Sequence, residues 1–135
     1  MRYKTPVLLL LVLPLLGARP LPAHHSPSAV FDMANKFSVT GTLTKVDWIN
    51  PHIEVYLDAK KGDGGVENWK FESNPPSWFR RVGLARDDIA KGLGQTVTIE
   101  GVRAKNGGLY GYLLKITFAD GNSVELEFKP TGNGQ

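Results

Sequence analysis

Apolar and polar residues alternate one by one along five segments of this chain, and this alternation constrains the fold most strongly. In the first segment, Phe37, Val39 and Leu43 alternate with serine and threonine. A period of two places the apolar side chains on one face of a β-strand, which then faces a core. The pattern therefore predicts an all-β domain. The further segments are residues 52–58, 67–72, 96–104 and 110–118, and Val124, Leu126 and Phe128 predict a last short strand.

The parity of the apolar positions changes within the first strand. Leu43 is odd-numbered, whereas Val46 and Trp48 are even-numbered. One extra residue in a strand produces such a change, so we expect a β-bulge near Thr44 and Lys45. The first strand should therefore be long and bent.

Three strands precede a short helical linker, and two or three follow it. Residues 77–82 are expected to form a short helix, because two prolines precede them and Gly83 follows. Residues 86–91 predict a further helical turn. This order is typical of a small Greek-key β-barrel of the OB type. A plain β-sandwich, or a barrel of another connectivity, is the alternative.

A basic and then strongly apolar segment opens the chain. The apolar run covers residues 7–16, and the small residue Ala23 ends the segment. This pattern is typical of a secretory signal peptide over residues 1–23, and the run is shorter than the about 20 residues of a membrane-spanning helix. We therefore expect a periplasmic or secreted protein with no transmembrane segment after cleavage. Cleavage after Ala18 and an uncleaved membrane anchor are the alternatives.

The remainder of the chain is expected to be one domain. An extended N-terminal arm (residues 24–36) should precede the barrel (37–129), with Phe31 and Met33 packing the arm onto it. A disordered tail (130–135) should follow, because it is short and rich in glycine.

Cleavage also changes the charge of the chain. The signal peptide carries Arg2, Lys4 and Arg19 but no acid, so the 16 basic side chains fall to the number of acidic ones, 13. A neutral domain has no general attraction to nucleic acid or to anionic membranes. The chain has no cysteine, which excludes thiolate metal sites, cysteine nucleophiles and disulfides.

Seven short motifs together resemble a family of exported bacterial proteins of unknown function. The family's mature chains begin with His-His-Ser, and its hallmarks include Trp-x-Asn-Pro-His and Trp-x-Phe-Glu. The resemblance implies export and covers most of the mature chain, but it implies no catalytic role. The matching residues are His24-His25-Ser26, Phe31-Asp32, Val39 to Thr42, Trp48 to His52, Trp69 to Glu72, Arg80 to Gly83 and Thr98 to Lys105.

The three histidines are the candidate metal ligands. If His24 starts the mature protein, its α-amine and its Nδ1 can chelate one metal ion. His25 or His52 would supply a third nitrogen, which gives a T-shaped site of the histidine-brace kind. Nitrogen ligands in a tetragonal arrangement suit Cu(II). The structural alternative is that His24-His25 suits the signal peptidase and that His52 caps the proline turn.

Two further residues share a strand face with His52. Glu54 and Tyr56 follow it at intervals of two, so they are candidates for orienting a metal-bound histidine through hydrogen bonds.

A ligand groove is the second candidate site, because OB barrels bind oligomers on the face of their second and third strands. Aromatic residues would line the groove and arginines would supply a basic patch. The alternative is that these aromatic residues belong to the core and that the arginines are solvated. The candidates are Trp48, Trp78, Arg80, Arg81, Tyr110 and Tyr112.

These patterns favour a non-catalytic binding protein over an enzyme. Ser26 lies beside His25 without an orienting acid, and Asp87 and Asp88 are adjacent and would point apart. The leading hypothesis is a periplasmic protein that binds copper through its N-terminal histidine. The alternative is a metal-independent OB module that binds a small ligand or an envelope protein. Nucleic acid is not an expected partner.

Overall fold

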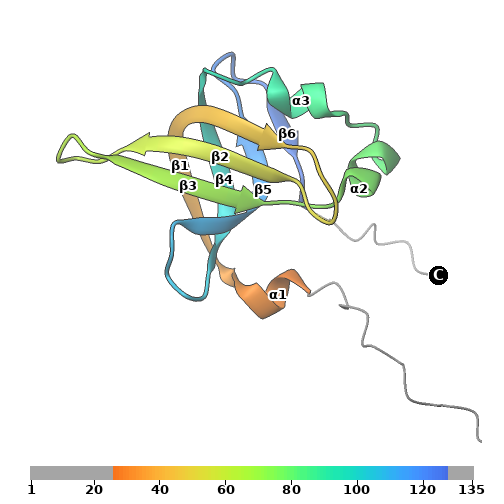
Figure 1. Cartoon of the computed structure of the whole chain (residues 1–135), viewed down its shortest axis with the longest axis horizontal. Coiled ribbons are helices and arrows are strands. Elements are labelled where there is room, and N and C mark those ends of the chain that lie inside the picture. The colour runs from red at the N-terminus through yellow and green to blue at the C-terminus, as the bar shows by residue number, and fades with distance from the viewer. Residues whose placement is uncertain (1–25, 128–135) are drawn as a thin grey trace, which may run out of the picture.

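The structure, a computed structural model, describes residues 26–127 as six strands and three short helices (Figure 1). Within these residues, no helix has both the length and the apolar character needed to cross a membrane. In chain order the elements are α1 (Pro27–Val30), β1 (Phe31–Asp47), β2 (Glu54–Lys60), β3 (Val66–Glu72), α2 (Pro76–Arg81), α3 (Arg86–Ala90), β4 (Thr96–Ala104), β5 (Tyr110–Thr117) and β6 (Ser123–Glu125).

A parallel pairing of β3 with β5 closes the sheet into a barrel. The strands follow the order β3-β2-β1-β4-β5-β6, and every other neighbouring pair is antiparallel. The chain passes from β3 to β4 through α2 and α3. This connectivity is that of an OB-type barrel. The predicted OB-like fold is therefore confirmed, and the closing pair excludes the plain sandwich.

The long strand β1 belongs to both halves of the barrel. Thr42 pairs with Thr96 of β4 and with Asp58 of β2. The register with β2 then shifts between Leu43 and Lys45, which confirms the predicted bulge. At Gly41 a Cβ atom would lie 2.4 Å from the Asp58 carbonyl oxygen. Only glycine therefore allows the two strands to approach this closely.

Most of the predicted core is buried in one cluster inside the barrel. Val39 is partly buried and packs against that cluster. The other predicted core residues in the cluster are Leu43, Val55, Leu57, Trp69, Phe71, Val97, Ile99 and Ile116.

Alternation along residues 110–118 predicts Leu114 in the same core as Ile116, and this prediction is wrong. Leu114 is buried in a second cluster, which contains Phe31 and Tyr112, and Leu113 takes its place in the barrel interior. The cause is a register shift, because Glu100 pairs with Lys115 but Gly101 pairs with Leu113. This bulge leaves Leu114 without a partner and reverses the parity of β5.

The arm expected over residues 24–36 is only partly extended. Residues 27–30 form α1, and β1 begins at Phe31 rather than at Phe37. Phe31 is 1% exposed, and its ring centroid lies 5.0 Å from that of Tyr110. Phe31 thus fixes the arm to the barrel as expected, whereas Met33 is 43% exposed and does not. Residues 24 and 25, and the tail predicted over 130–135, lie outside the described residues.

The helical linker lies within one residue of its expected position. The helix expected over residues 77–82 is α2, and the turn expected over 86–91 is α3. The fold therefore has three short helices within residues 26–127, whereas the sequence predicts one helix and one helical turn.

Leu57 provides a test of the core. Its side chain is fully buried, so Leu57→Ala should lower the free energy of unfolding by about 2–5 kcal/mol. Val66→Ala, in the same hairpin but 55% exposed, should change it by about 0.5 kcal/mol or less. Denaturant unfolding of both variants measures the difference. A cost below about 1 kcal/mol for Leu57→Ala would show that the assigned inner face of β2 is wrong.

Candidate binding face

Charged and aromatic side chains form a continuous run on the outer surface of β1, β2, β3 and β5. Since alternate residues of a strand share one face, Tyr56 and its β3 partner Lys70 both point away from the core. Lys70 also pairs with Tyr110 across the closing pair of strands. We call this run the polar strip; it consists of Lys45, Asp47, Tyr56, Glu54, Lys70, Tyr110, Glu72 and His52.

Tyr56 connects one end of the strip with its middle. Lys45 Nζ lies 2.6 Å from Asp47 Oδ2 and 4.9 Å from the centre of the Tyr56 ring. The Tyr56 hydroxyl donates a hydrogen bond to Glu54 Oε2 at 2.6 Å. The Lys45 ammonium group is therefore held by Asp47, and the Tyr56 ring that it contacts is held by Glu54.

Lys70 continues the strip toward β5. Its Nζ donates to Glu54 Oε1 at 2.9 Å and lies 4.6 Å from the centre of the Tyr110 ring. The Tyr110 hydroxyl in turn donates to Glu72 Oε2. Glu54 thus accepts from Tyr56 and Lys70 with different oxygens, which links β2 to β3, and the Lys70 contact with Tyr110 extends the connection to β5.

His52 lies at the far end of the strip, just before β2. Its Nδ1 lies 2.9 Å from Glu72 Oε1 and 3.1 Å from the Ser73 carbonyl oxygen. Its side chain is 23% exposed. Glu72 therefore connects His52 to Tyr110, and Tyr110 packs on Phe31 at the base of the arm.

Glu72 is a carboxylate that contacts His52 Nδ1. Glu54 and Tyr56, the two residues predicted to support the histidine, bond to each other, and Glu54 also accepts from Lys70. Glu72 is the last residue of the Trp-x-Phe-Glu motif, but the sequence pattern did not predict a role for it in a site. The register of the β2–β3 hairpin could have indicated such a role, since the turn after Lys60 places Glu72 opposite Glu54.

The strip shifts the ionisation of its own members. The Tyr56 hydrogen bond and Lys70 hold the pKa of Glu54 below its ordinary value. The hydrogen bond to Glu54, together with burial, raises the pKa of Tyr56 to about 12. Burial and the Glu72 carboxylate raise the pKa of Tyr110, and the same two causes raise that of Tyr112 to about 12.

A shallow hollow of about 360 Å³ lies over the Lys45 end of the strip. Tyr56 and Lys70 form part of its wall, and Asn68 Nδ2 donates to Asp58 Oδ1 at 2.7 Å beside them. The polar groups here are thus already paired with each other. The complete lining is Thr44, Lys45, Tyr56, Asp58, Asn68, Trp69 and Lys70.

The structure divides the six groove candidates between two places. Trp48 and Trp78 both pack on Phe79, with ring centroids 4.9 Å and 5.2 Å away, and Arg80 and Arg81 are exposed on the same helix. Tyr110 and Tyr112 instead lie beneath Phe31, with ring centroids 5.0 Å and 5.5 Å from it. Only Tyr110 of the six belongs to the strip.

Two of the three metal candidates, His24 and His25, lie outside the described residues. His52 is the one histidine within residues 26–127. In that range no three histidine, aspartate or glutamate side chains are grouped so that they could hold a metal ion. A site of the predicted kind therefore depends on the arm.

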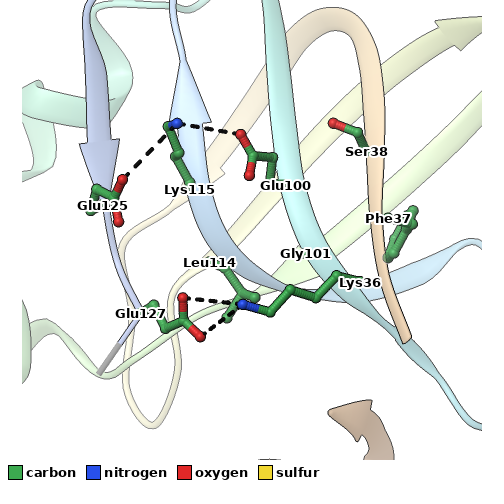
Figure 2. Close-up of a pocket in the computed structure, with 9 residues that line it drawn as sticks. All are labelled: Lys36, Phe37, Ser38, Glu100, Gly101, Leu114, Lys115, Glu125 and Glu127. Atoms are coloured by element: carbon green, nitrogen blue, oxygen red, sulfur yellow. Dashed lines mark hydrogen bonds and ion pairs between the residues drawn. The ribbon is translucent and has the colours of Figure 1, made fainter. Parts of the chain in front are cut away.

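A second hollow, of about 440 Å³, lies on the outer surface of β4 and β5 (Figure 2). Lys36 crosses it to reach Glu127 at 3.0 Å, and Lys115 lies 3.4 Å from Glu100. Leu114, turned outward by the β5 bulge, forms part of its floor. Both lysines of this hollow are paired with carboxylates, and its three glutamates leave a small excess of negative charge.

The sequence matches a protein-family description over residues 15–113. The chain belongs to the family of unknown function DUF6152. The matched region contains every residue of the polar strip, from Lys45 to Tyr110, and ends within β5. The resemblance inferred from the seven motifs, to a family of unknown function, is thereby confirmed.

No curated protein matches the DUF6152 chain significantly. A crystal structure of the mitochondrial single-stranded DNA binding protein Rim1 from S. cerevisiae matches with a TM-score of 0.44 and 13% identity. The match covers 72% of this chain and 98% of the yeast chain. Similarity at this level carries no conclusion about function.

The raised tyrosine pKa values predict late ionisation. In the native chain from His24 onward, tyrosinate absorbance should appear with midpoints near 12 for Tyr56 and Tyr112, against 10 in the unfolded chain. Because the native state holds these protons more tightly, their stabilisation is complete below pH 10 and is lost as the pH rises toward 12. Ultraviolet titrations with and without denaturant measure both states.

Tyr112→Phe provides the control for this titration. It should remove one of the late ionisations and leave the others in place. Native and denatured titration curves that coincide near pH 10 would show that the hydroxyls are not held as described.

Proposed function

We propose that this DUF6152 protein is an exported, non-catalytic binding protein whose binding face is the polar strip. The observation that carries the proposal is the position of the strip, since OB barrels bind ligands on the outer face of their second and third strands. Its side chains are held by one another across four strands. A preorganised face of this kind lowers the entropy cost of binding.

The charge of the strip favours a cationic or neutral ligand. Lys45 is paired with Asp47, and Lys70 with Glu54, so neither cation is available to neutralise a phosphate chain. Glu72 adds a further carboxylate beside His52. Nucleic acid binding depends on lysines and arginines that face phosphates, so we do not propose a nucleic-acid partner.

Export into the periplasm or to the exterior is part of the proposal. It rests on the basic residues, the apolar run and the small residue Ala23 in the first 23 positions. We expect the protein recovered from the periplasm or medium to begin at His24. Intact mass and N-terminal sequencing measure this directly. A protein that keeps Met1, or that begins at Arg19, would remove the amine chelate on which the next proposal depends.

Cu(II) is the specific ligand that we propose, bound by His24 with nitrogen from His25 or His52. Two observations support it. A metal-ligating histidine generally donates its second ring N–H to a carboxylate or a backbone carbonyl, and His52 Nδ1 contacts Glu72 and the Ser73 carbonyl in this manner. In addition, Phe31 fixes the base of the arm on Tyr110, whose hydroxyl bonds to the same Glu72.

The residues between His24 and Phe31 set the reach of the arm from its anchor. Six residues separate His24 from Phe31, and four of them form α1. The helical residues advance the chain by about 6 Å and two extended residues would add about 7 Å, so the segment reaches about 13 Å from its anchor. An N-terminus at His24 would thus extend from Phe31. Phe31 contacts Tyr110, and Glu72 connects Tyr110 to His52.

Copper titration of the chain beginning at His24 tests this proposal. One equivalent of Cu(II) should bind with a nitrogen-rich, tetragonal electron paramagnetic resonance spectrum. His52→Ala should weaken binding and change the spectrum. Glu72→Gln should weaken it about 10- to 100-fold, because it disturbs the residue that orients His52. Glu100→Gln, an exposed glutamate on β4, is the control and should bind like the parent.

An N-terminal extension completes the copper experiment. One extra residue before His24 should weaken binding, because it moves the amine out of chelating position. If the parent, the His52→Ala variant and the extended chain bind equally, copper is held only by the two adjacent histidines. The same strip acting without metal, on a small ligand or an envelope protein, would then be the better account.

A further inference from the structure

The β1–β2 loop and α2 form one exposed corner of the barrel. The Trp48 ring packs edge-on against Phe79 of α2, with centroids 4.9 Å apart, which fixes the loop to the helix. Figure 1 shows both segments at the same end, opposite the β2–β3 hairpin. We call this the loop–helix corner and define it by Ile49, Trp78, Arg80, Arg81 and Val82.

Large apolar side chains of the corner are open to solvent. Ile49 is 56% exposed and Val82 is 50% exposed, and these are among the most exposed apolar side chains of the described chain. Trp78 is partly exposed and lies one helical turn before Val82, whose N–H donates to the Trp78 carbonyl. Residues four apart share a helix face. Trp78 of α2 and Val82, which caps the helix, therefore lie on the same side of this segment.

Two arginines of the corner lack a compensating acid in the structure. No ion pair within residues 26–127 includes Arg80 or Arg81. The nearest acids in sequence, in α3, are already engaged: Asp87 lies 3.9 Å from Arg86, and Asp88 accepts from the Ala85 N–H at 2.7 Å. The corner is thus locally basic, although the chain as a whole has no such excess after residue 23.

We propose that the loop–helix corner docks onto the surface of an anionic lipid bilayer. Tryptophan has an apolar ring and a polar N–H, and it is enriched at the boundary between lipid and water. Isoleucine and valine beside it would enter the acyl boundary, while the arginines remain at the level of the headgroups and pair with phosphate. Two aliphatic side chains bury little area, so the contact is reversible and requires the charge.

This proposal is independent of the proposed ligand. The corner and the polar strip share no residue, and the strip is internally paired whereas the corner is not. Docking through the corner would hold an exported binding protein close to a membrane and leave the strip uncovered.

Vesicle binding by the chain from His24 onward tests the proposal; this form contains the whole described barrel and lacks the apolar run. It should sediment with vesicles that contain phosphatidylglycerol and not with phosphatidylcholine vesicles. Arg80→Gln should weaken partitioning about fivefold, and Arg80→Gln with Arg81→Gln about 25-fold. Brominated lipids should quench the tryptophan fluorescence, and Trp78→Phe should reduce that quenching.

The matched control is at the tip of the β2–β3 hairpin. Lys60→Gln with Lys61→Gln removes the same charge from exposed positions at the opposite end of the molecule, and it should leave partitioning unchanged. Circular dichroism verifies that each variant is folded. Equal binding to both kinds of vesicle would overturn the proposal, as would equal losses in the arginine and lysine variants. Binding without quenching by brominated lipid would also overturn it.

Discussion

The close approach of β1 to β2 at Gly41 is the constraint on which the rest of the structure depends. One continuous strand pairs with β4 from Phe31 to Thr42 and with β2 from Thr42 to Asp47, so Thr42 pairs with both. A side chain at position 41 would collide with the Asp58 carbonyl, and the bulge that follows bends the strand. This bend brings β3 round to β5. The closing pair then places Lys70 beside Tyr110, so the polar strip is a product of barrel closure.

The outer surface of the barrel divides its charges into two kinds of region. In the polar strip, and around the hollow of Figure 2, each lysine is paired with a carboxylate. These pairs fix side-chain positions more than they add stability, because exposed ion pairs contribute little free energy. At the loop–helix corner the arginines have no such partner within the described residues. The first arrangement suits a defined ligand, and the second suits a diffuse anionic surface.

Parity arguments predicted the fold well because burial of one strand face is a local property. Leu57 and Trp69 were placed in the core by alternation alone, and the change of parity after Leu43 located the bulge. The second bulge, at Leu114, gave no such signal, since Leu113 and Leu114 are both leucine and each suits a buried position. Glu72 was missed because its role depends on pairing across strands. The sequence predicted that β1 begins at Phe37 instead of Phe31. Phe31 packs in the second cluster, outside the barrel core, so the alternation that marks the core-facing residues does not extend to it.

The central claim is that His52 and its neighbours in the polar strip form the binding face, with the N-terminal arm directed toward it. Paramagnetic broadening measures this most directly. With one equivalent of Cu(II) on the chain from His24, the amide resonances of His52, Ser73 and Tyr110 should broaden, while those of the β2–β3 hairpin tip at residues 60–65 remain sharp. Broadening confined to the first residues of the arm, with His52 and Ser73 unaffected, would contradict the account.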